Sequence, residues 1–193
     1  REKKLTALSA GAENIPYGRF TKPLRSLAWS PDGRYLAFSG QKNHREYIFL
    51  YEPASGKVKR AALEGLTEMR QPAFSPDGKK VAFVGMKGGF NDLYEVPLDL
   101  LSQGGELPFS AAARLTESAQ DESSPSYSPD GKTLAYSCEV ENPGGPARAL
   151  CELRPGETPV IEPAADGSVY DPVYSADGTG IYFIGDAGDN IEL

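Results

Sequence analysis

The chain has 193 residues, a length typical of one domain of roughly 150 residues rather than two. Its 20 Lys and Arg residues against 27 Asp and Glu residues give a net charge of −7. This balance argues against nucleic-acid binding, since phosphates are neutralised by clustered cations. No stretch approaches the ~20 apolar residues of a membrane-spanning helix. The 21 Gly, 16 Pro and 10 Tyr residues indicate short strands joined by turns.

One four-residue turn recurs along the chain. Its copies are Ser30-Pro31-Asp32-Gly33, Ser75-Pro76-Asp77-Gly78, Ser128-Pro129-Asp130-Gly131 and the variant Ser175-Ala176-Asp177-Gly178. Pro presets φ for a turn, Asp hydrogen-bonds nearby backbone N–H groups, and Gly accepts the positive φ that leaves the turn. We therefore interpret the four Asp and four Gly residues as structural turn residues, not as acids or metal ligands.

Predicted strands surround each turn in the same order. A strand ending in an aromatic residue precedes it, at Trp29, Phe74, Tyr127 and Tyr174. Alternating second strands follow at residues 35–38, 81–84, 134–137 and 181–184, and third strands at 47–51, 92–96, 149–153 and 190–193. Weaker fourth strands lie near residues 58–61, 113–116 and 160–162. Each unit is therefore predicted to be a four-stranded antiparallel sheet.

Such sheets, repeated every 45 to 53 residues, are typical of a β-propeller. We predict an all-β fold with a single propeller region over residues 1–193. Its blades are expected at about 24–63, 71–117, 125–163 and 171–193. The last blade is either truncated or completed by residues 1–8, which would close a ring of four. We favour a window on a larger propeller, because an open arc leaves an unpaired face.

The second unit is longer than the others. Its extra residues, 98–109, contain Gly104-Gly105 and Pro108. We predict a loop insertion between its third and fourth strands, and not a domain boundary.

The repeat carries a family resemblance. The pattern aromatic-Ser-Pro-Asp-Gly-x-x-apolar-Ala-aromatic, at residues 29–38, 74–83 and 127–136, resembles the WD40-like propeller repeat of TolB-type proteins. Arg114-Leu115-Thr116 and Lys4-Leu5-Thr6 resemble the ends of such repeats. The resemblance implies a propeller of about six blades. It also implies a periplasmic or exported bacterial protein with partners in an envelope complex.

Candidate catalytic and metal-binding residues are few. His44 is the one histidine, and neither a Gly-x-Ser-x-Gly elbow nor a metal-ligand spacing accompanies it. The acidic loop 186–190 offers oxygen ligands for calcium but lacks the EF-hand spacing, so we expect an ordinary hairpin loop. We predict no catalytic residue, no metal and no cofactor.

The two cysteines leave two alternatives open. Cys138 and Cys151 form either one disulfide, which would fit an oxidising compartment, or two separate buried thiols.

Charge is divided between the halves of the chain. Residues 1–96 hold 16 basic and 10 acidic residues, whereas residues 97–193 hold 4 basic and 17 acidic ones. We expect this division to reappear on the face opposite the recurring turns, where the other loops gather, with apolar anchors between the charges. The candidate partner-binding residues are Lys42, His44, Arg45, Met69, Arg70, Lys87, Phe90, Asp121, Glu122, Tyr170, Asp171 and Asp186. Further acidic residues expected there are Glu139, Glu141, Asp166 and Asp189.

The leading functional hypothesis is a non-catalytic propeller that binds protein partners, binds no nucleic acid and does not span a membrane. The alternative is the gating propeller of a prolyl-oligopeptidase-like or tricorn-like serine peptidase, whose catalytic residues would lie outside these residues. A third, weaker hypothesis is a propeller that binds a small molecule or sugar.

Overall fold

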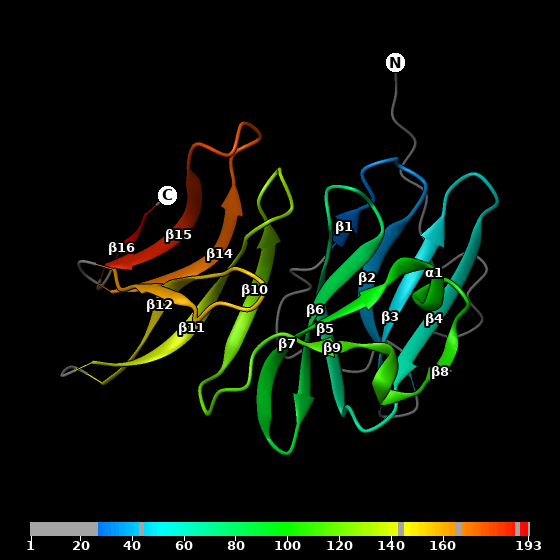
Figure 1. The fold of residues 1–193 in the computed structure, drawn as a ribbon, viewed down its shortest axis with the longest axis horizontal. Coiled ribbons are helices and arrows are strands. Elements are labelled where there is room, and N and C mark those ends of the chain that lie inside the picture. The colour runs from blue at the N-terminus through cyan, green and yellow to red at the C-terminus, as the bar shows by residue number, and fades with distance from the viewer. Residues whose placement is uncertain (1–26, 43–44, 143–144, 165–166, 188–189, 193) are drawn as a thin grey trace.

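The computed structural model describes residues 27–42, 45–142, 145–164, 167–187 and 190–192. They form four sheets, antiparallel apart from one added parallel strand in the first, which we call blades 1 to 4 in chain order (Figure 1). The predicted β-propeller architecture of antiparallel blades is confirmed. The predicted closing strand at residues 1–8 lies outside the described residues.

Neighbouring strands within each blade follow one another in chain order, except that the fifth strand of blade 1 comes from the chain segment of blade 2. Blade 1 contains β1 (Leu27–Trp29), β2 (Leu36–Lys42), β3 (Arg45–Glu52), β4 (Lys57–Leu63) and β8 (Gly105–Leu107). Blade 2 contains β5 (Glu68–Phe74), β6 (Lys80–Lys87), β7 (Phe90–Pro97) and β9 (Ala113–Arg114). Blade 3 contains β10 (Glu122–Tyr127), β11 (Leu134–Asn142), β12 (Gly145–Leu153) and β13 (Val160–Glu162). Blade 4 contains β14 (Ser168–Tyr174), β15 (Ile181–Ala187) and β16 (Asn190–Glu192).

The recurring turns join the first and second strands of each blade, along the upper side of the view in Figure 1. In the second turn, Gly78 N–H donates to Ser75 O at 2.8 Å, and Asp77 Oδ1 accepts from Ser75 Oγ at 2.7 Å. The hydroxyl of Ser75 and the backbone of Lys79 hold the pKa of Asp77 below its ordinary value. The four turn glycines have φ between +68° and +72°. The turn geometry therefore uses both Asp and Gly, as their chemistry predicts.

The insertion in blade 2 has more structure than the predicted loop. It contains α1 (Leu98–Leu101), β8 and the 3-10 helix η1 (Phe109–Ala111), and β8 pairs in parallel with β4 of blade 1. The insertion lies between the third and fourth strands of blade 2, as predicted, but it is more ordered than a loop because Leu101 and Leu107 bury their side chains in the core between blades 1 and 2. The insertion thus extends the neighbouring blade.

The hydrophobic core lies between blades. Along β6, Val81 and Phe83 face blade 1, whereas Ala82 and Val84 face blade 3, because successive residues of a strand point to opposite sides. A smaller cluster that includes Val169 joins blades 3 and 4. Full burial of each large apolar side chain contributes roughly 1.5–3 kcal/mol. Packing against neighbouring blades therefore makes a large contribution to the stability of each blade.

In blades 2, 3 and 4, the aromatic residue before the turn contacts the preceding blade. Tyr127 Oη donates to Glu95 Oε2 at 2.6 Å, and Tyr174 Oη donates to Glu152. Burial and this hydrogen bond raise the pKa of Tyr127 above its ordinary value. Phe74 has no hydroxyl, and it packs against the apolar cluster between blades 1 and 2. One recurring aromatic position therefore makes a contact at each of the three junctions between the four blades.

The two cysteines form a disulfide. Cys138 lies on β11 and Cys151 on β12, with their Cα atoms 6.0 Å apart. Both side chains are buried between blades 2 and 3. The bond thus cross-links the two central strands of blade 3.

The described residues also include no helix with the length and hydropathy needed to cross a membrane.

We expect Gly78→Val to lower the free energy of unfolding by about 1 kcal/mol or more, because a β-branched residue resists positive φ. A Cβ at Gly78 would meet only Pro31 Cδ, at 3.7 Å, so strain of the backbone is the cause. Gly78→Asn is the control, since Asn tolerates this conformation better. Urea unfolding measures both variants, and equal losses would contradict the interpretation.

We expect Cys138→Ala/Cys151→Ala to lose about 3 kcal/mol of stability, because the disulfide closes a short loop in the unfolded chain. Urea unfolding of the oxidised protein, with and without a reductant, provides an independent comparison. Reduction that leaves the unfolding midpoint unchanged would contradict a stabilising disulfide.

Candidate functional site

The second-to-third-strand hairpins lie at the ends of the blades opposite the recurring turns. We call this side, together with the links that enter each blade, the loop-bearing face. In blade 2 the hairpin closes between Lys87 and Phe90, which pair across Gly88 and Gly89. Phe90 is 46% exposed, and the side chain of Lys87 is exposed with its Nζ 3.7 Å from the ring centroid of Phe109. A cation and an aromatic ring are therefore presented together at this hairpin.

A polar chain crosses the loop-bearing face from blade 2 to blade 3. Arg70 Nη2 donates to Asn91 Oδ1 at 2.7 Å, and Asn91 Nδ2 donates to Asp121 Oδ1 at 2.8 Å. Arg70 also forms an ion pair with Glu68 at 3.0 Å. Arg70 and Asp121, both predicted for partner binding, are thus joined through Asn91 and engaged within the chain.

Arg148, on β12, fixes the next part of this face. Its Nη2 donates to Asp121 O at 3.1 Å and to Ser123 Oγ at 2.8 Å, while its Nε donates to Ser137 Oγ at 2.8 Å. Ser137 in turn donates to Val169 O of blade 4 at 2.7 Å. Sequence reasoning missed Arg148. The available signal was its rarity, as one of only 4 basic residues in residues 97–193.

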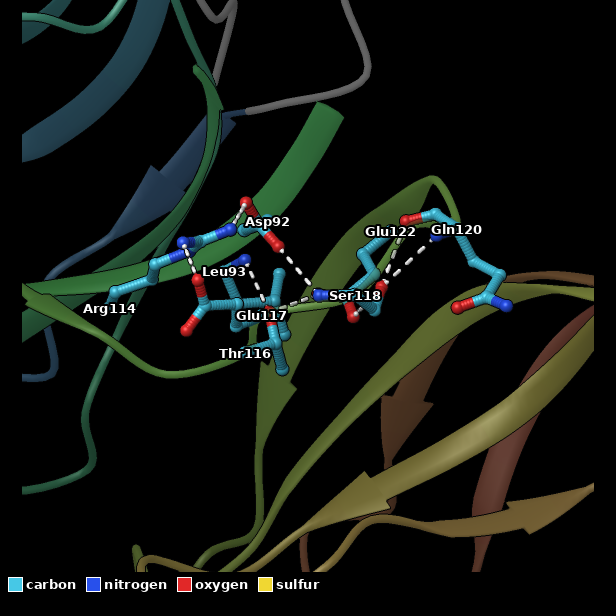
Figure 2. A network of polar contacts seen from close by, with 8 residues as sticks. All are labelled: Asp92, Leu93, Arg114, Thr116, Glu117, Ser118, Gln120 and Glu122. Atoms are coloured by element: carbon cyan, nitrogen blue, oxygen red, sulfur yellow. Dashed lines mark hydrogen bonds and ion pairs between the residues drawn. The ribbon is translucent and has the colours of Figure 1, made fainter. Parts of the chain in front are cut away.

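A second network lies at the junction of blades 2 and 3 (Figure 2). Asp92 is fully buried, pairs with Arg114 at 2.7 Å and accepts from Ser118 N–H at 3.2 Å. Glu122 accepts from the hydroxyls of Thr116 and Ser118. Blade 2 and the link 115–121 therefore share one hydrogen-bonded group with the first strand of blade 3.

Two of the predicted surface residues are buried. Met69 is 1% exposed in the core between blades 1 and 2, and Glu122 is 4% exposed in the network of Figure 2. Both predictions of an exposed partner-binding role are wrong, because strands β5 and β10 turn these side chains toward a neighbouring blade. Burial raises the pKa of Glu122 to about 7, against the opposing hydrogen bonds from Thr116 and Ser118.

Ion pairs within the chain neutralise part of the positive charge that was predicted for the loop-bearing face of blades 1 and 2. Arg45 forms an ion pair with Glu106 of the insertion at 2.9 Å and donates to Leu63 O at 3.0 Å. Glu139 is partly exposed and Glu141 exposed, so acidic side chains remain on the side of blade 3. His44, Asp166 and Asp189, and the side chains of Lys42 and Asp186, lie outside the described part of the chain.

Tyr170 and Asp171 lie on the first strand of blade 4, beside a central groove. Asp171 Oδ1 accepts from Ser124 Oγ at 2.6 Å, and Ser124 exchanges two hydrogen bonds of 3.0 Å with the side chain of Gln71. These three residues line a groove of about 640 Å³ between β5, β10 and β14. Of the predicted partner-binding residues that the structure describes, Asp171 alone lines this groove.

The same three residues share an unusual backbone. Gln71, Ser124 and Asp171 have φ of 52°, 56° and 47°, and each precedes a proline in a strand bulge. Positive φ is strained for these residue types and persists only where neighbouring contacts enforce it. The repeated pattern x-Pro-x-aromatic-Ser marks these positions in the sequence, and we did not predict a groove from it.

Comparison with known proteins identifies the family. The sequence model of the TolB beta propeller domain matches residues 9–193. The chain belongs to the TolB β-propeller family. The resemblance inferred from its repeats is therefore confirmed. No curated protein matches the sequence significantly.

Solved structures support the fold of this TolB-family chain. TolB from Acinetobacter baumannii is 25% identical, with a TM-score of 0.67 over 88% of this chain and 39% of that one. A putative TolB from Agrobacterium tumefaciens is 18% identical, with a TM-score of 0.59 over 81% and 57%. The tricorn protease is 16% identical, with a TM-score of 0.58 over 86% and 15%. The chain thus spans less than two thirds of each of these proteins.

The described residues of this TolB-family chain contain no group of three His, Cys, Asp or Glu side chains arranged to hold a metal ion. Both cysteines are in the disulfide. The hairpin of blade 2 presents an aromatic ring and a cation on the loop-bearing face.

We expect stability to depend on the ionisation of Glu122. Its pKa is raised from an ordinary 4.5 to about 7, so the folded state favours the protonated carboxyl. The resulting stabilisation, at most about 3 kcal/mol, is fully present below pH 4.5 and is lost as the pH rises through 7.

Urea unfolding of wild type and Glu122→Gln between pH 5 and 8 measures this effect. Relative to the variant, the wild type should lose stability as the pH rises, because Gln cannot ionise. If the stability of the wild type minus that of the variant stays constant or increases with pH, Glu122 is not the group responsible.

Proposed function

We propose that this TolB-family chain is a non-catalytic, protein-binding propeller region that works in a protein complex of the bacterial cell envelope. The observation that carries the proposal is the hairpin of blade 2, where Phe90 is exposed beside Lys87 on the loop-bearing face. Aromatic residues dominate binding energy at protein interfaces, and nearby charges set specificity and the rate of association.

The surroundings of this hairpin favour binding. Arg148 and Asn91 fix the backbone and side chains of the links between blades 2 and 3 with hydrogen bonds. The insertion holds Lys87 over the ring of Phe109. A surface ordered before binding loses less conformational entropy when a partner docks. The face is therefore suited to a rigid-body contact with another folded protein.

The disulfide supports an exported location. Disulfides persist in oxidising compartments such as the periplasm and are rare in the reducing cytosol. Cys138 and Cys151 are buried and paired within one blade, as expected of a structural bond. The TolB family membership supports the same compartment and an envelope-associated complex.

The second candidate is a gating propeller of a serine peptidase. The similarity to the tricorn protease favours it, although at 16% identity this similarity concerns the fold alone. Its catalytic residues would lie outside this chain. Activity of the isolated chain on peptides would overturn the non-catalytic proposal.

Site-specific photo-crosslinking tests the leading proposal. We expect a photoreactive p-benzoylphenylalanine at position 90 to give a discrete protein adduct in the intact envelope. The same group at Thr179, directly after the recurring turn of blade 4, should give none. Lys87→Glu in the first variant should reduce the adduct at least about threefold, because it reverses the charge beside the anchor.

The contrasting outcomes are specific. Equal adducts from positions 90 and 179 would indicate contact without a defined face. Absence of any adduct from position 90 would contradict a protein-binding role for this hairpin.

A further inference from the structure

The outermost strand of blade 3 has an unpaired edge. Among the described residues, β13 pairs only with β12, and its other edge carries no strand. Val160 and Ile161, the first two residues of β13, are 56% and 54% exposed. Alternate N–H and C=O groups of such a strand point outward, where another extended chain can pair with them.

The residue types at this edge differ from those in the other blades. Strand register shows the equivalence, since the third-strand partners of these positions correspond from blade to blade. The equivalent pairs are Lys59 and Arg60 in blade 1, Ala113 and Arg114 in blade 2, and Val160 and Ile161 in blade 3. Edge strands avoid unwanted pairing by carrying charged side chains, Lys above all. Blade 3 alone among these three replaces the cations with two β-branched apolar residues.

Blade 1 shows that such an outer edge accepts an additional strand. β8 pairs in parallel with β4, with Ala61 opposite Gly105 and Leu63 opposite Leu107. Its added strand is three residues long, the same length as β13. Ala61 is the equivalent of Glu162, so the internal strand occupies the adjoining part of the same edge. The geometry needed for strand addition is therefore already present in this chain.

The charged side chains around this edge indicate which kind of segment would bind there. Glu157 and Glu162 are exposed on either side of the two apolar residues. The nearby Arg154 is held by Glu157 at 3.9 Å. Pro159 and Pro163 flank β13 and lack backbone N–H donors, so they limit the pairing to a short segment.

We propose that β13 binds an extended segment of a protein partner in which apolar residues alternate with Lys or Arg. The segment adds to blade 3 as a further strand. Because successive residues of a strand point to opposite faces, its apolar side chains lie beside Ile161 on one face and its cations lie beside Glu162 on the other. Main-chain hydrogen bonds supply affinity, and the alternating side chains supply specificity. This contact uses no residue of the loop-bearing face.

The test uses the full chain and a synthetic eight-residue peptide of alternating Val and Lys. Calorimetry measures affinity, and amide hydrogen exchange locates the contact. We expect slower exchange at residues 160–162 when the peptide is present. Ile161→Arg, which places in blade 3 the residue type of Arg60 and Arg114, should weaken binding at least about tenfold. Because Ile161 is exposed, the variant should keep the thermal stability of the wild type.

Three controls separate this contact from others. A peptide with alternate backbone amides methylated should not bind, because it cannot form the ladder. A peptide with Glu in place of Lys should bind more weakly. Phe90→Arg should leave peptide binding unchanged. The same variant should disrupt binding of a protein partner at the loop-bearing face. Failure of one proposal is therefore distinguishable from failure of the other.

Several results would overturn the proposal. They are no binding of the Val-Lys peptide, equal binding by Ile161→Arg, equal binding of the methylated peptide, or slower exchange confined to other residues. Self-association of the chain that protects residues 160–162 in the absence of peptide would assign this edge to a second copy instead.

Discussion

Each blade of this chain has apolar side chains on both of its faces, so the contact between neighbouring blades is the interaction on which the rest of the structure depends. A four-stranded sheet of this kind cannot bury both faces alone. In blades 2, 3 and 4, the aromatic residue before the turn makes the contact specific. Tyr127 and Tyr174 each bind a carboxylate of the preceding blade, whereas Phe74 packs on an apolar cluster that includes Leu50. The polarity of the aromatic residue on one blade therefore matches that of the residues it contacts on the preceding blade.

Polar groups at the junction of blades 2 and 3 add a second constraint. Asp92 and Glu122 are buried close to one another, and both depend on the link between the blades for their hydrogen bonds. Buried polar groups are costly unless satisfied, so the link has little freedom to move independently. The adjoining Asp121 carries this order to the loop-bearing face through Asn91 and Arg148. In this way packing inside the propeller orders the loop-bearing face, which we propose binds a partner.

The sequence predicts what is encoded locally and misses what depends on the neighbouring blade. The turns and the alternating strands follow from Pro, Asp, Gly and period-two hydrophobicity. Met69 and Glu122 were misplaced because exposure is decided by which blade packs on a strand, and local patterns do not contain that information. The sequence could not decide whether the two cysteines form a disulfide, because their distance depends on strand register. The order within the insertion was missed because β8 pairs with a strand more than 40 residues away, in another blade.

Amide hydrogen exchange of the intact chain, followed by mass spectrometry, tests the coupling between blades most directly. If inter-blade packing holds the blades together as one unit, the slowest amides of β6 in blade 2 and β11 in blade 3 should open with the same free energy. Different opening free energies for the two strands would contradict this coupling, since each blade would then be stable on its own.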